Sequence, residues 1–188
     1  MTKAPHSNDL CIVIDMQQGF RYPEATAILP QVQQLVERFP GQVVLSLFRN
    51  EPGSFFETRL RWKKMQREEE RALMPELDRA LLPRFWHSGY TVLTPELVQY
   101  IEAYAPDRVY IAGIYTDVCV LHTALSAADH GWHTLVVRDC CASLHGYRHH
   151  VMALETLLYA LGEEYMVPLQ SLLPQEDSPL PARKNALE

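Results

Sequence analysis

The sequence lacks the long apolar runs, the leader segment and the paired cysteines that mark membrane and secreted proteins. None of its apolar runs approaches the roughly 18 residues that a membrane span requires. Met1 to Asn8 have neither the basic nor the apolar region of a secretory signal peptide. The cysteines stand at positions 11, 119, 140 and 141, without the spacing of a zinc site or a disulfide framework. We therefore expect a reduced, cytoplasmic protein with no membrane partner.

An excess of positive charge is also absent. The formal net charge is -6, which argues against nucleic acid or an anionic membrane surface as the main partner. With 47% apolar and 21% charged residues, the composition is typical of a soluble globular protein. No internal repeat or linker divides the first 170 residues, so residues 1–188 are expected to form a single domain. Its core would span about 10–170, and the Pro- and charge-rich tail, 174–188, is expected to be loose.

Short apolar runs alternate with helical segments along the chain. This alternation predicts a doubly wound, Rossmann-like α/β domain of three layers with a parallel sheet of about six strands. The expected strands are 10–15, 42–48, 83–87, 109–114, 132–139 and 164–167. The expected helices are 25–39 (regular from near Pro30), 94–104 and 147–161, with 55–65 and 68–82 mostly helical.

A carboxylate, Asp15, stands at the end of the first expected strand. In open α/β sheets ligands bind just beyond the carboxyl ends of the strands. Directly after five apolar residues, Asp15 is either a catalytic group or a cap for the following turn.

A thiol follows the fourth expected strand. Gly113 permits an unusual backbone angle there, and Thr116 is a suitable N-cap for a helix that ends at Gly131. Cys119 would then lie in the first turn, where the positive end of the helix dipole favours the nucleophilic thiolate. The alternative is that Cys119 is an inert, buried small side chain. Helical spacing predicts a core-facing stripe of Val118, Leu121, Leu125 and Ala128.

Three sequence motifs resemble those of a known enzyme group. The runs Gly113-Ile-Tyr-Thr-Asp-Val-Cys-Val and Thr123-Ala-Leu-Ser-Ala-Ala-Asp-His-Gly resemble the nucleophile segment of the isochorismatase-like cysteine hydrolases. That superfamily includes nicotinamidases and N-carbamoylsarcosine amidase. Asp15-Met-Gln-Gln-Gly-Phe20 resembles its Asp-x-Gln-x-x-Phe motif, and the resemblance extends from about Leu10 to Val167.

The resemblance implies hydrolysis of a small, amide-type C–N bond through a covalent acyl-enzyme. Cys119 would be the nucleophile and Asp15 its proton acceptor, with the backbone N–H groups of Tyr115 and Cys119 as the oxyanion hole. The Ile114–Tyr115 peptide would be cis. The resemblance also implies a homodimer or a higher oligomer. Substrate-binding residues would be Gln17, Phe20, Tyr90 and Tyr115.

One position departs from the family pattern. Tyr90, Thr91, Thr94 and Leu97 follow it, but His87 stands where relatives have a lysine. With a reference pKa near 6.5, a histidine beside Asp15 can still act as the cation. The substitution is equally compatible with loss of the amidase chemistry, or with a loop histidine that has no role.

The sequence does not predict a metal or another cofactor. The loop Arg49 to Ser54 lacks the Asp-x-His pair of metal-dependent relatives and resembles metal-independent ones. His145, His149 and His150 are expected to form the N-terminal rim of the last helix rather than a metal site, since the adjacent pair cannot share a helix face.

Two further patterns leave alternatives open. Trp62, Lys63, Lys64 and Arg67 form a basic, aromatic patch that is either a solvated helix face or a contact for an anionic substrate. Cys140 and Cys141 are expected to pack at a strand end rather than to form a vicinal disulfide.

Beside the hydrolase, two other functions remain: a non-catalytic ligand-binding or interaction protein on the same fold, and a thiol sensor.

Overall fold

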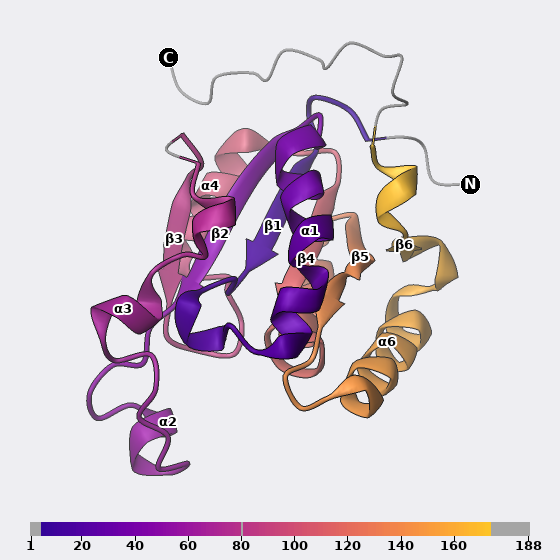
Figure 1. The fold of residues 1–188 in the computed structure, drawn as a ribbon. Coiled ribbons are helices and arrows are strands. Elements are labelled where there is room, and N and C mark those ends of the chain that lie inside the picture. Colours follow the sequence, from indigo (N-terminus) through magenta and orange to yellow (C-terminus); the bar gives the residue numbers. More distant parts are fainter. Residues whose placement is uncertain (1–4, 80, 174–188) are drawn as a thin grey trace.

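The computed structural model describes residues 5–79 and 81–173, which are built around one six-stranded sheet (Figure 1). All pairings between neighbouring strands are parallel, and the strand order is β3-β2-β1-β4-β5-β6. This confirms the predicted α/β fold class. The predicted loose tail, 174–188, lies outside the described residues. The strands are β1 (Leu10–Ile14), β2 (Gln42–Phe48), β3 (Arg84–His87), β4 (Val109–Ile114), β5 (Thr134–Ala142) and β6 (Met166–Val167).

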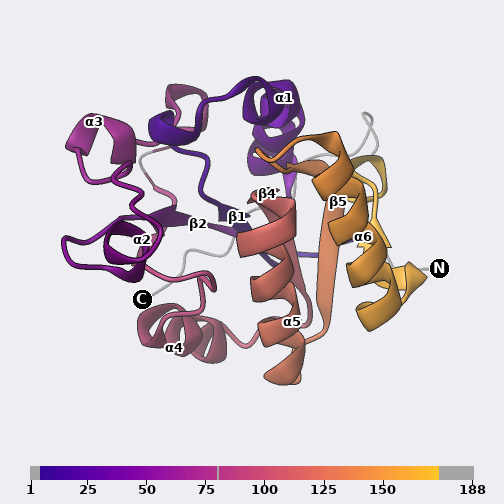
Figure 2. The same ribbon diagram turned by 90° about the horizontal axis from the view of Figure 1, so that it is seen from below.

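Helices cover both faces of the sheet, which gives three layers. Seen along the sheet, α1 lies on one face and α4 and α5 lie on the other, with α6 beside α5 (Figure 2). Two apolar clusters separate the layers, one under α1 and one under α4, α5 and α6. None of the helices in the described part of the chain is long and apolar enough to cross a membrane. The α-helices are α1 (Pro23–Arg38), α2 (Phe55–Thr58), α3 (Glu68–Arg71), α4 (Pro95–Tyr104), α5 (Leu121–Asp129) and α6 (Tyr147–Leu161).

Helix α1 begins earlier than its sequence suggests and continues through Pro30. Pro23 occupies the first helical turn, where its missing N–H costs nothing. Pro30 removes one interior hydrogen bond, but its side chain is exposed and leaves the buried face intact. Packing of that face on the sheet outweighs the local defect. The buried residues of α1 are Ala25, Leu29, Val32, Leu35 and Val36.

The prediction that 55–65 and 68–82 are mostly helical is wrong. The described residues of these two ranges form only the single turns α2 and α3 and a 3-10 turn at Pro75–Leu77. Side chains from elsewhere bind the carbonyls that a longer helix would use. Asn50 Nδ2 donates to the carbonyls of Trp62 and Lys64, and Gln17 Nε2 donates to that of Arg71.

Strand β5 extends to Ala142, beyond the predicted end at residue 139, and therefore contains Cys140 and Cys141. A register shift against β4 lies between Ile111 and Gly113 and accommodates extra β5 residues. Both thiols therefore pack in the sheet, where they are buried. Strand β6 is shorter than predicted, because a 3-10 turn occupies Glu163–Tyr165.

The strand order predicts that a ligand binds beyond the carboxyl ends of β1 and β4, which are neighbours at the centre of the sheet. The chain moves outward from β1 through β2 and β3, and then from β4 through β5 and β6. Ligands bind at such a switch point, beyond the carboxyl ends of the strands. Gly113 allows the two central strands to approach closely. It has φ +116°, and a Cβ atom there would lie 2.2 Å from the Ile14 carbonyl oxygen.

Candidate active site

Asp15 lies at the carboxyl end of β1, in the centre of this edge. Its backbone has φ 57°, a left-handed conformation that a non-glycine residue seldom adopts. Its N–H donates to the carbonyl of Ser46 on β2 at 2.9 Å. The side chain is buried, so the backbone turn directs a carboxylate into the interior at the switch point. Backbone outliers of this kind cluster at functional sites.

His87 ends β3 and reaches the Asp15 carboxylate from two strands away. Its Nε2 lies 2.8 Å from Asp15 Oδ1, and both side chains are 1% exposed. Its Nδ1 lies 3.0 Å from the carbonyl oxygen of Gly89. Because a carbonyl only accepts, Nδ1 carries a hydrogen, and the contact between Nε2 and Oδ1 holds the remaining proton.

The charge of His87 follows from two opposing effects. Burial lowers its pKa, but the charge of Asp15 and the hydrogen bonds to Asp15 and Gly89 together raise the pKa above its ordinary value. This favours an imidazolium paired with a carboxylate. His87 therefore lies at the end of β3 with Asp15 as its partner, and not in a loop.

Cys119 lies beyond β4 in a π-helical turn, Thr116–Val120, that leads into α5. The prediction of Thr116 as N-cap is wrong, because its hydroxyl instead contacts His150 Nδ1 at 2.8 Å. The predicted core stripe is also shifted. The wider turn changes the helical phase, so that Cys119 points inward. The buried residues after it are Val120, Thr123, Ala124 and Ala127, whereas Val118, Leu121, Leu125 and Ala128 are half-buried.

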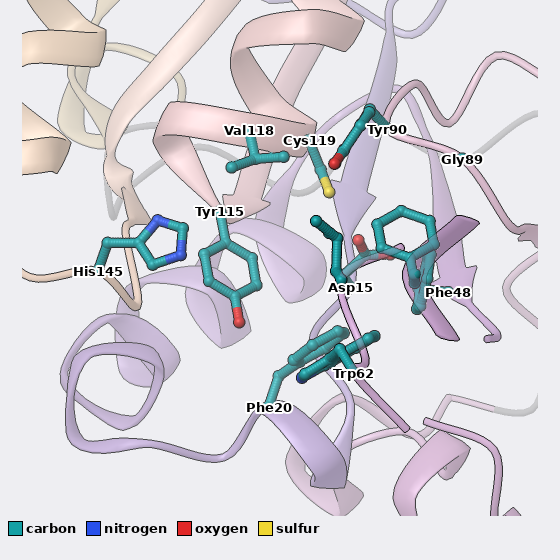
Figure 3. A pocket seen from close by; sticks show the side chains of 12 residues that line it. Asp15, Phe20, Phe48, Trp62, Gly89, Tyr90, Tyr115, Val118, Cys119 and His145 are labelled. Atoms are coloured by element: carbon teal, nitrogen blue, oxygen red, sulfur yellow. The ribbon is translucent and has the colours of Figure 1, made fainter. Parts of the chain in front are cut away.

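The sulfur of Cys119 points toward Asp15 (Figure 3). Burial and then the negative charge of Asp15 raise the pKa of this thiol well above its ordinary value. The expectation that the helix end favours a resting thiolate is therefore wrong, because burial and a carboxylate act more strongly than a partial helix charge. Asp15 Oδ2 is buried without a nitrogen or oxygen partner among the described residues. A thiol beside an unoccupied carboxylate oxygen is arranged for proton transfer.

A cavity of about 350 Å³ opens over these residues. Its floor contains Asp15 and Cys119, and aromatic rings form most of its wall (Figure 3). Phe20 and Trp62 lie nearly parallel, with ring centres 6.2 Å apart, and Tyr115 meets Phe20 edge-on. Such a site suits a flat or apolar ligand. The lining residues are Asp15, Phe20, Phe48, Phe56, Leu60, Trp62, Gly89, Tyr90, Tyr115, Val118, Cys119 and His145.

Three of the four expected substrate-binding residues line this cavity, namely Phe20, Tyr90 and Tyr115. The Ile114–Tyr115 peptide bond is cis. Gln17 is placed differently. Its amide is fully buried and bridges the backbone of Phe48, where it both donates and accepts, to the carbonyl of Arg71. All of these hydrogen bonds are to backbone, so Gln17 holds the cavity wall and does not face the ligand space.

Sequence reasoning missed part of the wall. Trp62 was predicted to belong to a basic, aromatic patch that is either a solvated helix face or a contact for an anionic substrate. Its ring lines the cavity, while the neighbouring cations pair at the surface: Lys63 with Glu57 and Arg67 with Glu70. For these wall residues, the signal that the sequence offered was a group of aromatic residues at irregular spacing. The other lining residues not predicted are Phe48, Phe56, Leu60, Gly89, Val118 and His145.

The loop after β2 has a structural role at the position where metal-dependent relatives carry their ligands. Asn50 is buried and its side chain bonds two backbone carbonyls and the hydroxyl of Ser54. This amide therefore joins Ser54 of the same loop to the backbone of Trp62 and Lys64.

Comparisons with known proteins identify the family of this chain. A family model described as the isochorismatase domain matches residues 9–164. Maleamate amidohydrolase of Pseudomonas putida is 24% identical over 175 residues, covering 82% of this chain and 79% of that protein. Isochorismatase domain-containing protein 2 of Xenopus laevis is 24% identical over 148 residues, or 75% of this chain. The chain spans only 63% of that protein's length.

The fold recurs in solved structures. The crystal structure of N-carbamoylsarcosine amidase from Thermoplasma acidophilum superposes with a TM-score of 0.73 at 21% identity, covering 82% of this chain and 92% of that one. The family match covers most of the chain and includes Asp15, His87 and Cys119. The chain belongs to the isochorismatase family.

Proposed function

We propose that this protein is a cysteine hydrolase that cleaves the C–N bond of a small, uncharged amide with an apolar or aromatic body. The carrying observation is that Cys119 faces Asp15 in one cavity, with His87 Nε2 2.8 Å from Oδ1 of the same carboxylate. The kinship to amidohydrolases, among them the maleamate amidohydrolase of Pseudomonas putida, supports the amide-type reaction.

The reaction begins with proton transfer from the thiol to Asp15 as the sulfur attacks the amide carbon. Because the thiol is protonated at rest, deprotonation and attack are coupled. The backbone N–H groups of Tyr115 and Cys119 stabilise the oxyanion. Asp15 then returns the proton to the leaving nitrogen as the C–N bond breaks, which gives an amine and a thioester on Cys119.

Water completes the cycle. Asp15 takes a proton from the water that attacks the thioester carbon, and the acid product leaves as the sulfur regains its proton from Asp15. His87 stays paired with Oδ1 throughout. It holds the carboxylate through Oδ1, which leaves Oδ2 without a nitrogen or oxygen partner among the described residues, and its positive charge offsets the negative charge that moves between carboxylate, sulfur and oxyanion.

The chemistry of the wall selects the substrate class. Among the described residues that line the cavity there is no arginine or lysine, and His145 is the one basic side chain. An amide that also carries a carboxylate would lack a strong counter-ion there, whereas an uncharged ring would pack against the aromatic wall formed by Phe20, Trp62 and Tyr115.

Turnover of a panel of small primary amides, followed by ammonia release, tests the proposal. Wild type should hydrolyse uncharged aromatic amides faster than anionic ones, and intact-mass spectrometry of quenched reactions should detect an acyl adduct on Cys119. Cys119→Ser should lose both signals, and Cys140→Ala, a matched change at a buried thiol outside the cavity, should keep them. Hydrolysis that survives in Cys119→Ser would refute the mechanism. Binding of the amides without turnover would favour the ligand-binding alternative.

A further inference from the structure

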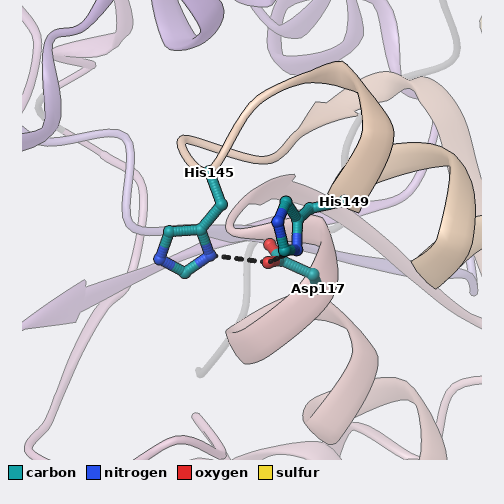
Figure 4. Close-up of side chains that lie close together, drawn as sticks. All are labelled: Asp117, His145 and His149. Carbon is teal, nitrogen blue, oxygen red and sulfur yellow. Dashed lines mark hydrogen bonds and ion pairs between the residues drawn. The ribbon is translucent and has the colours of Figure 1, made fainter.

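A second cluster of polar side chains lies outside the catalytic group. It consists of Asp117, His145 and His149, whose ligand atoms all lie within 4.8 Å of one another (Figure 4). Asp117 comes from the π-helical turn, His145 from the loop before α6, and His149 from the first turn of α6. We propose that these three side chains form a binding site for a divalent transition-metal ion of the Zn²⁺ type.

The spacing of the ligand atoms suits such an ion. His145 Nδ1 lies 2.6 Å from Asp117 Oδ2, and His149 Nδ1 lies 3.8 Å from the same oxygen. Zinc bonds to nitrogen and oxygen are about 2.0–2.2 Å long, which places neighbouring ligand atoms about 3–4 Å apart. Small side-chain rotations that open the contact between His145 and Asp117 therefore admit the ion.

The backbone that carries the ligands is already held in place. The N–H of His145 donates to Ser143 Oγ at 3.0 Å, and the N–H of His150 donates to the Gly146 carbonyl. The contact between Thr116 Oγ1 and His150 Nδ1 joins the π-helical turn to α6. Because these hydrogen bonds are formed within the chain itself, binding requires little additional ordering of the chain.

The donor set defines the class of metal. Two imidazole nitrogens and one carboxylate oxygen favour Zn²⁺, Co²⁺ or Ni²⁺, whereas Mg²⁺ and Ca²⁺ prefer all-oxygen sites. The histidine side chains are 54% and 55% exposed and that of Asp117 is 14% exposed, so an ion has direct access from solvent. Three protein ligands leave a position open for water. The positive end of α6 opposes a cation only weakly compared with direct ligation.

The site differs in position from the loop after β2, where the amide of Asn50 braces backbone instead. It also adjoins the cavity, because His145 lines the rim and its ring contacts Tyr115 with centres 5.1 Å apart. A bound ion would fix His145 and thereby the rim of the cavity. The sequence placed the histidines together but did not link them to Asp117, which is 28 residues from His145.

Titration of the chelator-stripped protein with Zn²⁺, followed by isothermal calorimetry, tests the site. Wild type should bind a single equivalent. His149→Ala and Asp117→Asn should each weaken binding about tenfold or more, since each removes a ligand. His130→Ala is the matched control: this exposed histidine stacks on Trp132 at the other end of α5, and its loss should leave the affinity unchanged.

A second measurement separates this site from the catalytic cavity. Cys119→Ser should bind Zn²⁺ as wild type does, and Co²⁺ bound to either protein should give the visible absorption of nitrogen and oxygen ligation without a thiolate band. The proposal is overturned if wild type and His149→Ala bind equally, if binding is lost in Cys119→Ser, or if wild type binds no Zn²⁺. None of these outcomes bears on amide hydrolysis, which is measured in the stripped protein.

Discussion

Two of the aspartate–histidine pairs among the described residues have similar contact distances and different surroundings. Asp15 and His87 are 2.8 Å apart with both side chains 1% exposed, whereas Asp117 and His145 are 2.6 Å apart with side chains 14% and 54% exposed. Distance therefore does not distinguish the pairs. Burial does distinguish them. Water screens the exposed pair of Asp117 and His145, called the outer pair, whereas the buried pair of Asp15 and His87, called the inner pair, interacts in a medium of low dielectric constant. The inner pair suits proton transfer, and the outer pair remains open to other ligands.

The largest expected effect comes from removing the acid of the inner pair. Asp15→Asn should lower kcat/KM for an amide substrate by about 10²–10⁴-fold, the usual contribution of a general base. Asp129→Asn, at an exposed aspartate at the end of α5, is the control and should retain activity. Steady-state kinetics on variants with native circular dichroism measures the difference. Comparable activity in both variants would remove Asp15 from the mechanism.

The histidine of the inner pair should matter for stability as well. His87→Ala leaves the buried Asp15 carboxylate without its cation, and breaking a buried pair from one side costs about 3–5 kcal/mol. The free energy of unfolding, measured in urea, should fall by an amount in this range. His87→Lys restores a cation and should recover part of the loss. A His87→Ala protein as stable as wild type would show that the buried pair does not stabilise the fold.

The pH dependence provides a finer test of the inner pair. The folded pKa of His87 is raised above its unfolded value, so its contribution to stability is complete below the unfolded pKa and is lost as the pH rises through the folded pKa. The free energy of unfolding of wild type should therefore decline at alkaline pH relative to that of His87→Lys, whose charge persists. Parallel curves for the two proteins would show that His87 carries no extra proton in the folded state.

The smallest effect is expected at the outer pair. His145→Ala removes an exposed ion pair, which contributes about 0–1 kcal/mol. Urea unfolding should show a change within that range, and added salt should reduce it further. A loss as large as that of His87→Ala would mean that the rim loop is a structural element of the core, and the comparison between the two pairs would fail.

Much of the fold was predictable from local patterns. Buried strands such as β1 and β4 are continuous apolar runs, and Thr94 caps α4 with its hydroxyl, which accepts from the N–H of Leu97. Errors arose where distant side chains decide the local conformation. The side chains of Gln17 and Asn50 bind backbone carbonyls that a helix would use, so the predicted helices at 55–65 and 68–82 are mostly replaced by loop. The hydroxyl of Thr116 contacts His150 instead of capping a helix.

In the candidate site too, local patterns predicted some features and distant side chains decided others. Asp15 and Cys119 were recognisable because each follows an apolar strand and lies in a motif that resembles the family, and His87 was recognisable as a departure from that motif. Their charge states were not predictable. The helix end alone suggests a thiolate at Cys119, but a carboxylate from another strand, together with burial, keeps the thiol protonated. The electrostatics of a side chain depend on neighbours that are distant in sequence.

The sequence by itself determined the alternation of strands and helices, the family, and the three polar residues that end strands β1, β3 and β4 or follow them closely. Periodicity and short motifs are local, so they can be read without knowing which segments meet. Only the tertiary structure decided that β1 lies beside β4, that Trp62 turns into the cavity, and that Asp117 meets His145 and His149. Each of these depends on packing between segments far apart in the chain, where many weak contacts, and no single residue pattern, select the arrangement.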